Sequence, residues 1–253
     1  MPSFSQKPPQ FAPLLRSDTY DLLRIRGDES PELMEQLGRA RSITFGSAGQ
    51  GTGAEVDLSA EDQHYHHLIL WHREDQCIAG AYRMGLIDEI LSRIGASGVY
   101  LDSVFHIDRE FYRRVSPSIE LSRSFIMPKY QRDSRGLSLL WKGLGRTAGD
   151  FGIRNLYGSV TMSNAFSRMS RSYCVAFLSK FHLDDQNIRS LVSPRQPFTS
   201  DWQPKLTELG NSGRMEHLAK AVHDYERGER ALPPLMRYYS SLGAKFIAFH
   251  VEA

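Results

Sequence analysis

Apolar and polar positions alternate with two different periods along the chain, which predicts strands and helices that follow one another. Strands are predicted where short apolar segments lie between turn residues, at 20–26, 65–73, 77–85, 98–105, 118–127, 153–163 and 244–252. Helices are predicted where apolar residues recur at helical spacing, at 31–45, 86–95, 108–115, 136–152, 164–181, 214–228 and 233–243. This mixture predicts an α/β or α+β domain built around one sheet.

Prolines, glycines and polar runs mark the segments between these elements. Residues 1–18 are rich in proline and predict a flexible N-terminal arm, and 46–62 form a glycine-rich loop that ends in acidic residues. The polar residues 74–76 separate two strands and predict a hairpin, while 182–212 is a long polar excursion. A length of 253 residues with 41% hydrophobic residues predicts one large domain over 19–253.

The predicted strand at 118–127 contains a charged residue where its pattern predicts a buried one. Ile119, Leu121, Phe125 and Met127 form the apolar set of an alternating strand, and Arg123 falls among them. A regular strand would therefore bury a guanidinium, which is costly for a charge without a partner. The segment predicts a carboxylate partner for Arg123, a bulge in the strand, or a working site on this face.

The balance of charge and the cysteines exclude several classes of protein. Lys and Arg number 31 and Asp and Glu 29, so the formal charge of +2 is far from the excess typical of nucleic-acid-binding proteins. Cys77 and Cys174 lack C-x-x-C spacing and indicate free thiols in a reducing compartment, so the cytoplasm is the expected location. No apolar stretch approaches the roughly 18 residues of a membrane span, and 1–15 lacks the apolar core of a signal peptide.

Several familiar motifs are suggested by the sequence but lack their structural context. His64, His66 and His67 cannot all lie on one face of a strand, so no metal site is expected there. The glycines of 49–53 follow a predicted helix and not a strand, which favours a flexible loop over a nucleotide site. The chain has neither the G-x-S-x-G motif of serine hydrolases nor the H-x-x-x-x-D spacing of glycerol-phosphate acyltransferases.

A set of charged residues in apolar or glycine-rich surroundings is the stronger candidate for chemistry. Its members are Arg41, Asp57, Asp62, Arg83, Glu120 and Arg123. Taken alone, they fit a solvated face with ordinary ion pairs as well as they fit a working site.

Seven segments, taken together and in order, carry a resemblance to a known family. They are RSITF, GTGAEVDLSAED, YHHLILWH, IAGAYRMG, IELSRSFIMPKYQR, LLWKGLG and YGSVTMSN. In this combination they resemble the GNAT-fold acyltransferases, in the branch that contains ornithine-lipid N-acyltransferases and hemolysin-like proteins and is related to acyl-homoserine-lactone synthases. The resemblance covers roughly 35–198, and the segment PPLMRYYSSLGAKF extends it.

The resemblance implies roles for individual residues. Those that match the acceptor-binding pattern are Arg41, Phe45, Asp57, Asp62 and Arg83. Glu120 and Arg123 match the glutamate and arginine of the fourth strand, and Arg123 would be held by Asp62 or Glu120. Two positions depart from the family: Ser59 stands where relatives usually carry a further acid, and Ser122 stands where hemolysin-like members carry glycine.

The family fold implies a mixed central sheet flanked by helices, with a fourth strand that bulges near Ser122 and splays from the fifth. The backbone amides of Phe125 and Ile126 would then face an acyl thioester and stabilise its oxyanion. The residues that follow, where such enzymes hold the pyrophosphate of coenzyme A, are Lys129, Arg132, Arg135 and Gly136. Because this turn has a single glycine, it favours an acyl carrier protein over coenzyme A, and the three basic residues would contact the acidic carrier.

The implied reaction is direct transfer of an acyl group to the amine of an amino acid or another small amine, as in ornithine lipid biosynthesis. Glu120 is the expected base, and Tyr157 or Ser159 would protonate the leaving thiol. Acyl carrier protein or coenzyme A supplies the acyl group, no metal or permanent cofactor is needed, and lipid synthesis implies peripheral contact with the inner face of a membrane. Two alternatives remain open: a homoserine-lactone-type signal synthase that uses S-adenosylmethionine, and a catalytically idle module that binds acyl carriers.

Overall fold

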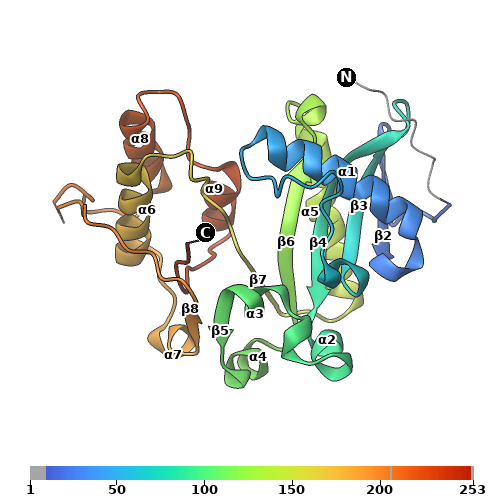
Figure 1. The fold of residues 1–253 in the computed structure, drawn as a ribbon, viewed down its shortest axis with the longest axis horizontal. Coiled ribbons are helices and arrows are strands. Elements are labelled where there is room, and N and C mark those ends of the chain that lie inside the picture. The colour runs from blue at the N-terminus through green and yellow to red at the C-terminus, as the bar shows by residue number, and fades with distance from the viewer. Residues whose placement is uncertain (1–9, 206, 252–253) are drawn as a thin grey trace. The chain divides into compact units, whose positions relative to one another are not determined.

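The computed structural model describes residues 10–205 and 207–251 and divides the chain into two compact units (Figure 1). The first unit contains the chain up to Tyr100 together with Val115–Ser159. The second contains Leu101–Arg114 and the chain from Val160 onward. The expectation of a single domain over 19–253 stays a prediction.

The first unit is built on a six-stranded mixed sheet in the order β1-β2-β3-β4-β6-β7. Its strands are β1 (Leu15–Arg16), β2 (Tyr20–Arg26), β3 (His66–His72), β4 (Cys77–Leu86), β6 (Ser118–Ile126) and β7 (Asn155–Gly158). Neighbouring strands are antiparallel except β6 and β7, which are parallel. The predicted mixed sheet flanked by helices is thereby confirmed.

Helices α1 (Pro31–Ser47) and α5 (Ser134–Asp150) cover opposite faces of this sheet (Figure 1). Helix α1 begins where the sequence predicts, because the Ser30 hydroxyl accepts a hydrogen bond from Leu33 N and Pro31 has no N–H to leave unpaired. Helix α2 (Ile87–Arg93) follows β4, and 3-10 helices lie in the connecting segments of this unit. They are η1 (Gly27–Glu29), η2 (Ala60–Gln63), η3 (Ala96–Gly98) and η4 (Pro128–Tyr130).

A bulge in β6 explains how Arg123 escapes burial in the core. The register against β4 shifts after Ser122, so that Arg123 and Ser124 together lie opposite Tyr82. Arg123 has a φ of 51°, in the left-handed region that few residues other than glycine adopt. The bulge predicted near Ser122 is therefore confirmed.

The bulge also exchanges the two faces of β6. Before it, Ile119 and Leu121 pack in the core on the α5 side of the sheet. After it, Phe125 packs on the α1 side, and Ile126 packs against the α5 side. Phe125 therefore does not share a face with Ile119 and Leu121, because the extra residue in the strand moves each later side chain to the other face, in keeping with the bulge that the resemblance implies.

Strand β7 is shorter than the predicted strand at 153–163, and it leaves one edge of β6 open. It pairs with Ser118–Leu121 and ends at Gly158. A Cβ at Gly158 would lie 2.2 Å from the Leu121 carbonyl oxygen, so the last paired position needs a glycine. Beyond Leu121, this edge of β6 has no strand partner within 10–205 and 207–251, which confirms the predicted separation of the two strands.

The second unit combines a two-stranded sheet with a cluster of helices. Strand β5 (Phe105–Ile107) pairs antiparallel with β8 (Val192–Pro194). The helices of this part of the chain are α3 (Tyr100–Val104), α4 (Arg109–Val115), α6 (Arg168–Phe181), α7 (Gln186–Arg189), α8 (Met215–Tyr225) and α9 (Pro234–Ser241). Phe177, Leu218 and Val222 are fully buried in its core.

Several predicted elements differ from the structure. The segment predicted as extended at 98–105 is mostly helical, because a short apolar run fits a strand and a buried helix equally well. The helix predicted from Asn164 begins at Arg168, after Ser167 as its cap. The strand predicted at 244–252 forms isolated bridges only. Of the predicted flexible arm, residues 1–9 lie outside the described residues, and Leu15–Arg16 pairs with β2.

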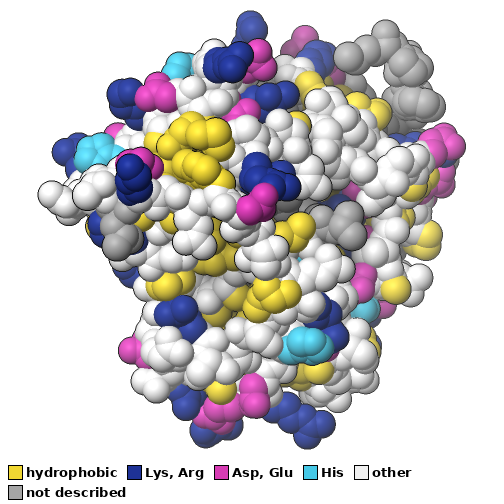
Figure 2. Space-filling model, turned by 60° about the vertical axis from the view of Figure 1, so that its left-hand side comes forward, with side chains coloured by type: hydrophobic (Ala, Val, Ile, Leu, Met, Phe, Trp, Pro, Cys, Tyr) yellow, Lys and Arg dark blue, Asp and Glu magenta, His cyan; other side chains and the backbone are white. Residues whose placement is uncertain are grey.

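Charges of both signs are interspersed on the face drawn in Figure 2, in keeping with the near balance of acidic and basic residues. None of the helices in the described part of the chain is long and apolar enough to cross a membrane.

Candidate active site

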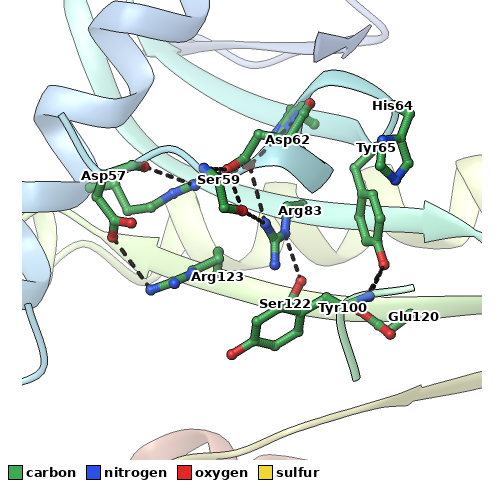
Figure 3. A network of polar contacts seen from close by, with 12 residues as sticks. Asp57, Ser59, Asp62, His64, Tyr65, Arg83, Tyr100, Glu120, Ser122 and Arg123 are labelled. Atoms are coloured by element: carbon green, nitrogen blue, oxygen red, sulfur yellow. Dashed lines mark hydrogen bonds and ion pairs between the residues drawn. The ribbon is translucent and has the colours of Figure 1, made fainter. Parts of the chain in front are cut away.

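Asp62 lies at the centre of a buried polar network in the first unit (Figure 3). Its carboxylate accepts a hydrogen bond from Ser59 N at 2.8 Å and so caps the 3-10 helix η2. Gly27 leaves room for this turn, because a Cβ there would lie 1.8 Å from the Asp62 carbonyl oxygen. Local capping and one close approach therefore fix where the carboxylate lies.

Two buried guanidinium groups bind the Asp62 carboxylate. Arg41 Nη1 donates to both carboxylate oxygens at 3.1 Å, and Arg83 Nη1 lies 3.4 Å from Oδ1. The three side chains are at most 3% exposed. Burial alone would raise the pKa of Asp62, but the two cations outweigh it and hold that pKa at about 2. Asp62 is therefore ionised at neutral pH and compensates two buried charges.

His67 completes the buried surroundings of Asp62. Its Nε2–H donates to the Asp62 carbonyl oxygen at 2.9 Å, and the ring is fully buried. Burial lowers the pKa of His67 to about 3, so the imidazole is neutral at neutral pH. Among the described residues, no group of three or more His, Cys, Asp or Glu side chains is arranged to hold a metal ion.

Arg83 connects strand β4 to β6 and to the loop before η2. Its Nε donates to Ser122 Oγ at 2.9 Å and its Nη1 to Ser59 Oγ at 3.0 Å. Its guanidinium carbon lies 5.0 Å and 4.9 Å from the ring centres of Tyr65 and Tyr100. The two serines that depart from the family pattern are thus hydrogen-bond acceptors for Arg83.

Arg123 has a carboxylate partner, as its position in the sequence predicts, but the partner is Asp57, and the pairing with Asp62 or Glu120 that the resemblance implied is wrong. Its Nη1 lies 3.4 Å from Asp57 Oδ2, and its guanidinium carbon lies 5.8 Å from the ring centre of Phe45. The bulge is the reason, because it turns the side chain toward the loop that carries Asp57 (Figure 3).

Glu120 is fully buried on β6 and accepts a hydrogen bond from Tyr65 OH at 3.0 Å. The same phenol oxygen accepts a hydrogen bond from Tyr100 N at 2.9 Å. Burial, and then the charge of Glu120, raise the pKa of Tyr65, so the phenol keeps its proton and donates it toward the carboxylate. Tyr157 is the partner of Glu120 in the register of β6 and β7, which brings these two predicted residues side by side.

The backbone of Ile126 lies on the open edge of β6. Met127 N donates to Ala79 O of β4 at 2.9 Å, and successive N–H groups of a strand point to opposite edges. The Ile126 N–H therefore points away from β4, and its carbonyl oxygen accepts a hydrogen bond from Gln131 Nε2 at 3.0 Å. Of the two N–H groups predicted to bind the oxyanion, that of Ile126 therefore points to the open edge. The ring of Phe125 packs against Phe45.

The predicted donor-binding residues lie in and before the first turn of α5, and two of their three charges are paired locally. Lys129 Nζ lies 2.6 Å from Asp75 Oδ2, and Arg135 Nε lies 2.8 Å from Asp133 Oδ1. Arg132 is exposed. Gly136 is buried inside α5, where a Cβ would lie 2.9 Å from Leu70 Cδ2, so it brings the helix close to the sheet.

Three residues that the network needs were not predicted from the sequence. Tyr65, Tyr100 and His67 supply hydrogen bonds or an aromatic surface to its charged members. The alternation of β3 could have indicated that His67 faces inward, since it lies among buried apolar residues. Nothing in the local sequence pairs Tyr65 with Glu120, 55 positions away. Ser159 is exposed beyond the end of β7, and its role stays a prediction.

Comparison with known proteins agrees with this geometry. Residues 40–142 match the family model described as an acetyltransferase (GNAT) domain, and this stretch contains all six of the charged residues singled out in the sequence.

Two curated relatives are glycine N(alpha)-acyltransferases, one from Bacteroides thetaiotaomicron and one from Phocaeicola vulgatus. Each is 31% identical to this chain over 233 residues, which is 86% of this chain and 68% and 70% of the respective relatives. The chain therefore belongs to the GNAT acyltransferase family. It is an N-acyltransferase.

Two solved structures show a weak likeness to the chain. One is the acyl-homoserine-lactone synthase LasI, with a TM-score of 0.37 and 14% identity over 55% of this chain and 70% of that one. The other is an aminoglycoside acetyltransferase from an uncultured soil metagenomic sample, with a TM-score of 0.38 and 9% identity over 74% of this chain and 98% of that one. Likeness at this level carries no argument about the site.

Proposed function

We propose that the chain transfers a fatty acyl group from the thioester of an acyl carrier protein to the amine of an amino acid, with glycine as the first acceptor to test. The observation that carries this proposal is the position of Glu120, a buried carboxylate held by Tyr65 beside the place where β6 and β7 separate. The two relatives named glycine N(alpha)-acyltransferase support the choice of acceptor. In this proposal the chain belongs to the ornithine-lipid and hemolysin-like branch and acts in aminolipid biosynthesis at the inner face of the membrane.

Glu120 acts as the base in the proposed reaction. An amine is mostly protonated near neutral pH and must lose a proton before its lone pair can attack a carbonyl carbon. Glu120 takes this proton, directly or through a water molecule, and the amine nitrogen forms a bond to the thioester carbon. Tyr65 holds the carboxylate in place through its hydrogen bond.

The tetrahedral intermediate needs a donor for its oxyanion and a proton for its leaving group. The Ile126 N–H on the open edge of β6 is suited to the oxyanion, because a fixed backbone donor costs no reorganisation during the reaction. When the carbon–sulfur bond breaks, the thiolate accepts a proton from Tyr157, which is paired with Glu120, or from Ser159 after it. The nitrogen, which carries one proton more than an amide after its attack, gives that proton to the resulting phenolate or alkoxide, and Glu120 releases its own proton to water.

The start of helix α5 supports a carrier protein over free coenzyme A as donor. Asp133 caps this helix, and its Oδ1 accepts a hydrogen bond from Arg135 N at 3.0 Å. A carboxylate already occupies the helix terminus that would otherwise favour a pyrophosphate. The prosthetic group of a carrier brings a single phosphate, and exposed Arg132, with Lys129 and Arg135, would contact the acidic carrier.

The remaining predicted residues shape the acceptor side of the site. Arg41, Arg83 and Asp62 form its buried support, while Asp57 and Phe45 surround Arg123. Because the Asp62 carboxylate is saturated by cations and by Ser59, we assign it to positioning and not to proton transfer.

The test is a transfer assay with defined donors. Purified chain is incubated with glycine and with either acyl carrier protein or coenzyme A charged with the same fatty acyl group, and N-acylglycine is measured by mass spectrometry. We expect product from both donors and faster transfer from the carrier protein. Uncharged carrier is the control, and lipid extracts of cells that express the chain identify the product in vivo. Absence of any N-acylated amine would contradict the proposal.

A further inference from the structure

We propose that Arg123 binds the carboxylate of the acceptor, so that the chain selects amino acids with a free carboxylate over simple amines. This inference rests on the proposed N-acyl transfer to an amino acid and names the residue that recognises the acceptor.

Arg123 differs from the other two arginines of the network in its access to solvent. The side chains of Arg41 and Arg83 are 1% and 0% exposed, whereas that of Arg123 is 23% exposed. A substrate can therefore reach Arg123 without displacing the buried support of the site.

The hydrogen bonding of Arg123 is incomplete. Within the described residues, the side chain of Arg123 makes one hydrogen bond, with Asp57. Its donor–acceptor distance of 3.4 Å is longer than the usual range of about 2.7–3.2 Å. A guanidinium has five N–H donors, arranged so that two of them can bind the two oxygens of a carboxylate at once. Asp57 therefore orients Arg123 without saturating it.

The surroundings of Arg123 present this donor edge to a ligand. Phe45 lies against the guanidinium, 5.8 Å from its carbon to the ring centre, and Phe45 is itself packed edge-on against Phe125. An aromatic ring covers the face of a guanidinium and leaves the N–H edge available. This arrangement suits a planar carboxylate.

The backbone at Arg123 is in an unfavourable conformation that the local structure maintains. A φ of 51° is unfavourable for a residue with a Cβ, and glycine would avoid this cost. The bulge brings the Arg123 side chain to the α1 side of the sheet, the side on which Glu120 meets Tyr65. The amine and the carboxylate of one small amino acid can therefore be held by the same strand, the amine near Glu120 and the carboxylate at Arg123.

The experiment compares glycine with glycinamide, which has the same shape but no carboxylate. Thiol release from acyl carrier protein is measured as a function of acceptor concentration for the parent chain. Chemistry alone favours glycinamide, because its amine is the more easily deprotonated. We expect the parent to prefer glycine by about 10-fold to 100-fold in kcat/KM, the usual effect of hydrogen bonds between charged groups.

Variants then assign this preference to Arg123. Arg123→Gln should remove the preference for glycine, to a ratio of one or below because the amine of glycinamide is the more easily deprotonated, chiefly by raising the KM for glycine. Arg123→Lys should retain part of the preference. Arg146→Gln is the matched control, because Arg146 is an exposed arginine on α5 bonded to Asp150, and it should keep the parent preference. Thermal unfolding of each variant confirms that it is folded.

The outcomes separate this inference from the proposed function. Equal use of glycine and glycinamide by the parent would overturn the role of Arg123 while leaving N-acyl transfer in place. An equal loss with both acceptors in Arg123→Gln would also overturn it. Transfer to no acceptor by the parent would overturn the proposed function, and this inference with it.

Discussion

The two parts of the polar network differ in how tightly they are held. Around Asp62, two guanidiniums at most 1% exposed bind one carboxylate, and helix α1, η2 and strand β4 all contribute. Around Arg123, one guanidinium 23% exposed is tethered by a single 3.4 Å contact on a left-handed backbone. Tightly compensated buried charges are suited to hold a fold, whereas a loosely paired charge at a backbone outlier is suited to meet a substrate.

The same contrast divides strand β6. Residues 119–121 are paired with both β4 and β7, whereas among the described residues the part of β6 beyond Leu121 is paired with β4 alone. Glu120 lies in the doubly paired part, next to the residue at which the open edge begins. A fixed proton acceptor beside an accessible backbone donor is what the proposed direct transfer requires.

Removing the Asp62 charge should have the largest effect on stability. Asp62→Asn keeps the volume but leaves two buried guanidiniums without their anion, which should lower the free energy of unfolding by about 3–5 kcal/mol. Chemical denaturation measures this difference. Asp150→Asn is the control, since Asp150 forms its ion pairs with Arg24 and Arg146 at the surface, where solvent screens them, and it should cost far less than Asp62→Asn. Equal losses in the two variants would contradict a structural role for Asp62.

Acidic pH should weaken the Asp62 part of the network next. The folded pKa of His67 is about 3, below its ordinary value of 6.5, so between these values the unfolded chain binds the proton more readily. The contribution of neutral His67 to the free energy of unfolding is therefore fully present above pH 6.5. It falls as the pH drops below this value, by roughly 1.4 kcal/mol per pH unit, or about 2 kcal/mol at pH 5.

Asp62 adds a further loss at lower pH. Its folded pKa of about 2 lies below the ordinary value of 3.8, so its contribution is present above 3.8 and disappears as the pH falls through 2. Denaturation curves between pH 7 and pH 2 measure both effects. His67→Gln should flatten the curve between pH 6.5 and pH 5, and an unchanged slope in this variant would show that another group is responsible.

Tyr65→Phe should slow acyl transfer, because Tyr65 is bonded to Glu120 on strand β6. The variant removes the donor to Glu120, and a carboxylate without this donor is less stable in its charged form. We expect transfer to fall by about 10-fold and the acidic limb of the pH–rate profile to move to higher pH. A lower rate with an unmoved profile would mean that Tyr65 supports the structure alone.

Reversing a charge among Lys129, Arg132 and Arg135, the basic residues near the start of α5, should have the smallest effect. Arg132→Glu should raise the KM for acyl carrier protein by about two-fold to five-fold at low salt, and the difference should disappear as salt is added. Lys129→Glu should have less effect, because Asp75 already neutralises Lys129. Lys142→Glu, the same change further along α5, is the control. Equal effects at all salt concentrations would argue against a carrier-binding surface here.

Local signals in the sequence predicted much of the fold. Ser30 and Pro31 mark the start of α1 through a cap and a missing N–H, both of which depend only on neighbouring residues. The strand predicted at 244–252 was wrong because a strand needs a partner edge, and the described residues there meet only single bridges. Pattern alone does not reveal which edges are available.

The sequence predicted which charged residues belong to the candidate site, but not which of them bond to one another. All six charged residues were singled out by their unusual surroundings and by the resemblance, and the structure buries five of them. Arg123 was paired with the wrong carboxylates because its direction depends on a bulge against β4, more than 40 positions earlier in the chain. Tyr65 was missed for the same reason, since its contact with Glu120 exists only once the sheet has formed.

The substitution Glu120→Gln tests most directly whether Glu120 is the base of the reaction while the buried network around Asp62 stabilises the fold. It keeps the volume and the hydrogen-bond acceptor for Tyr65 but removes the base, so thermal unfolding should stay near that of the parent. Thiol release from acyl carrier protein in the presence of glycine should fall by roughly 10²–10⁴, the usual contribution of general-base catalysis. A Glu120→Gln protein that melts well below the parent and still transfers acyl groups at the parent rate would contradict the catalytic role of Glu120.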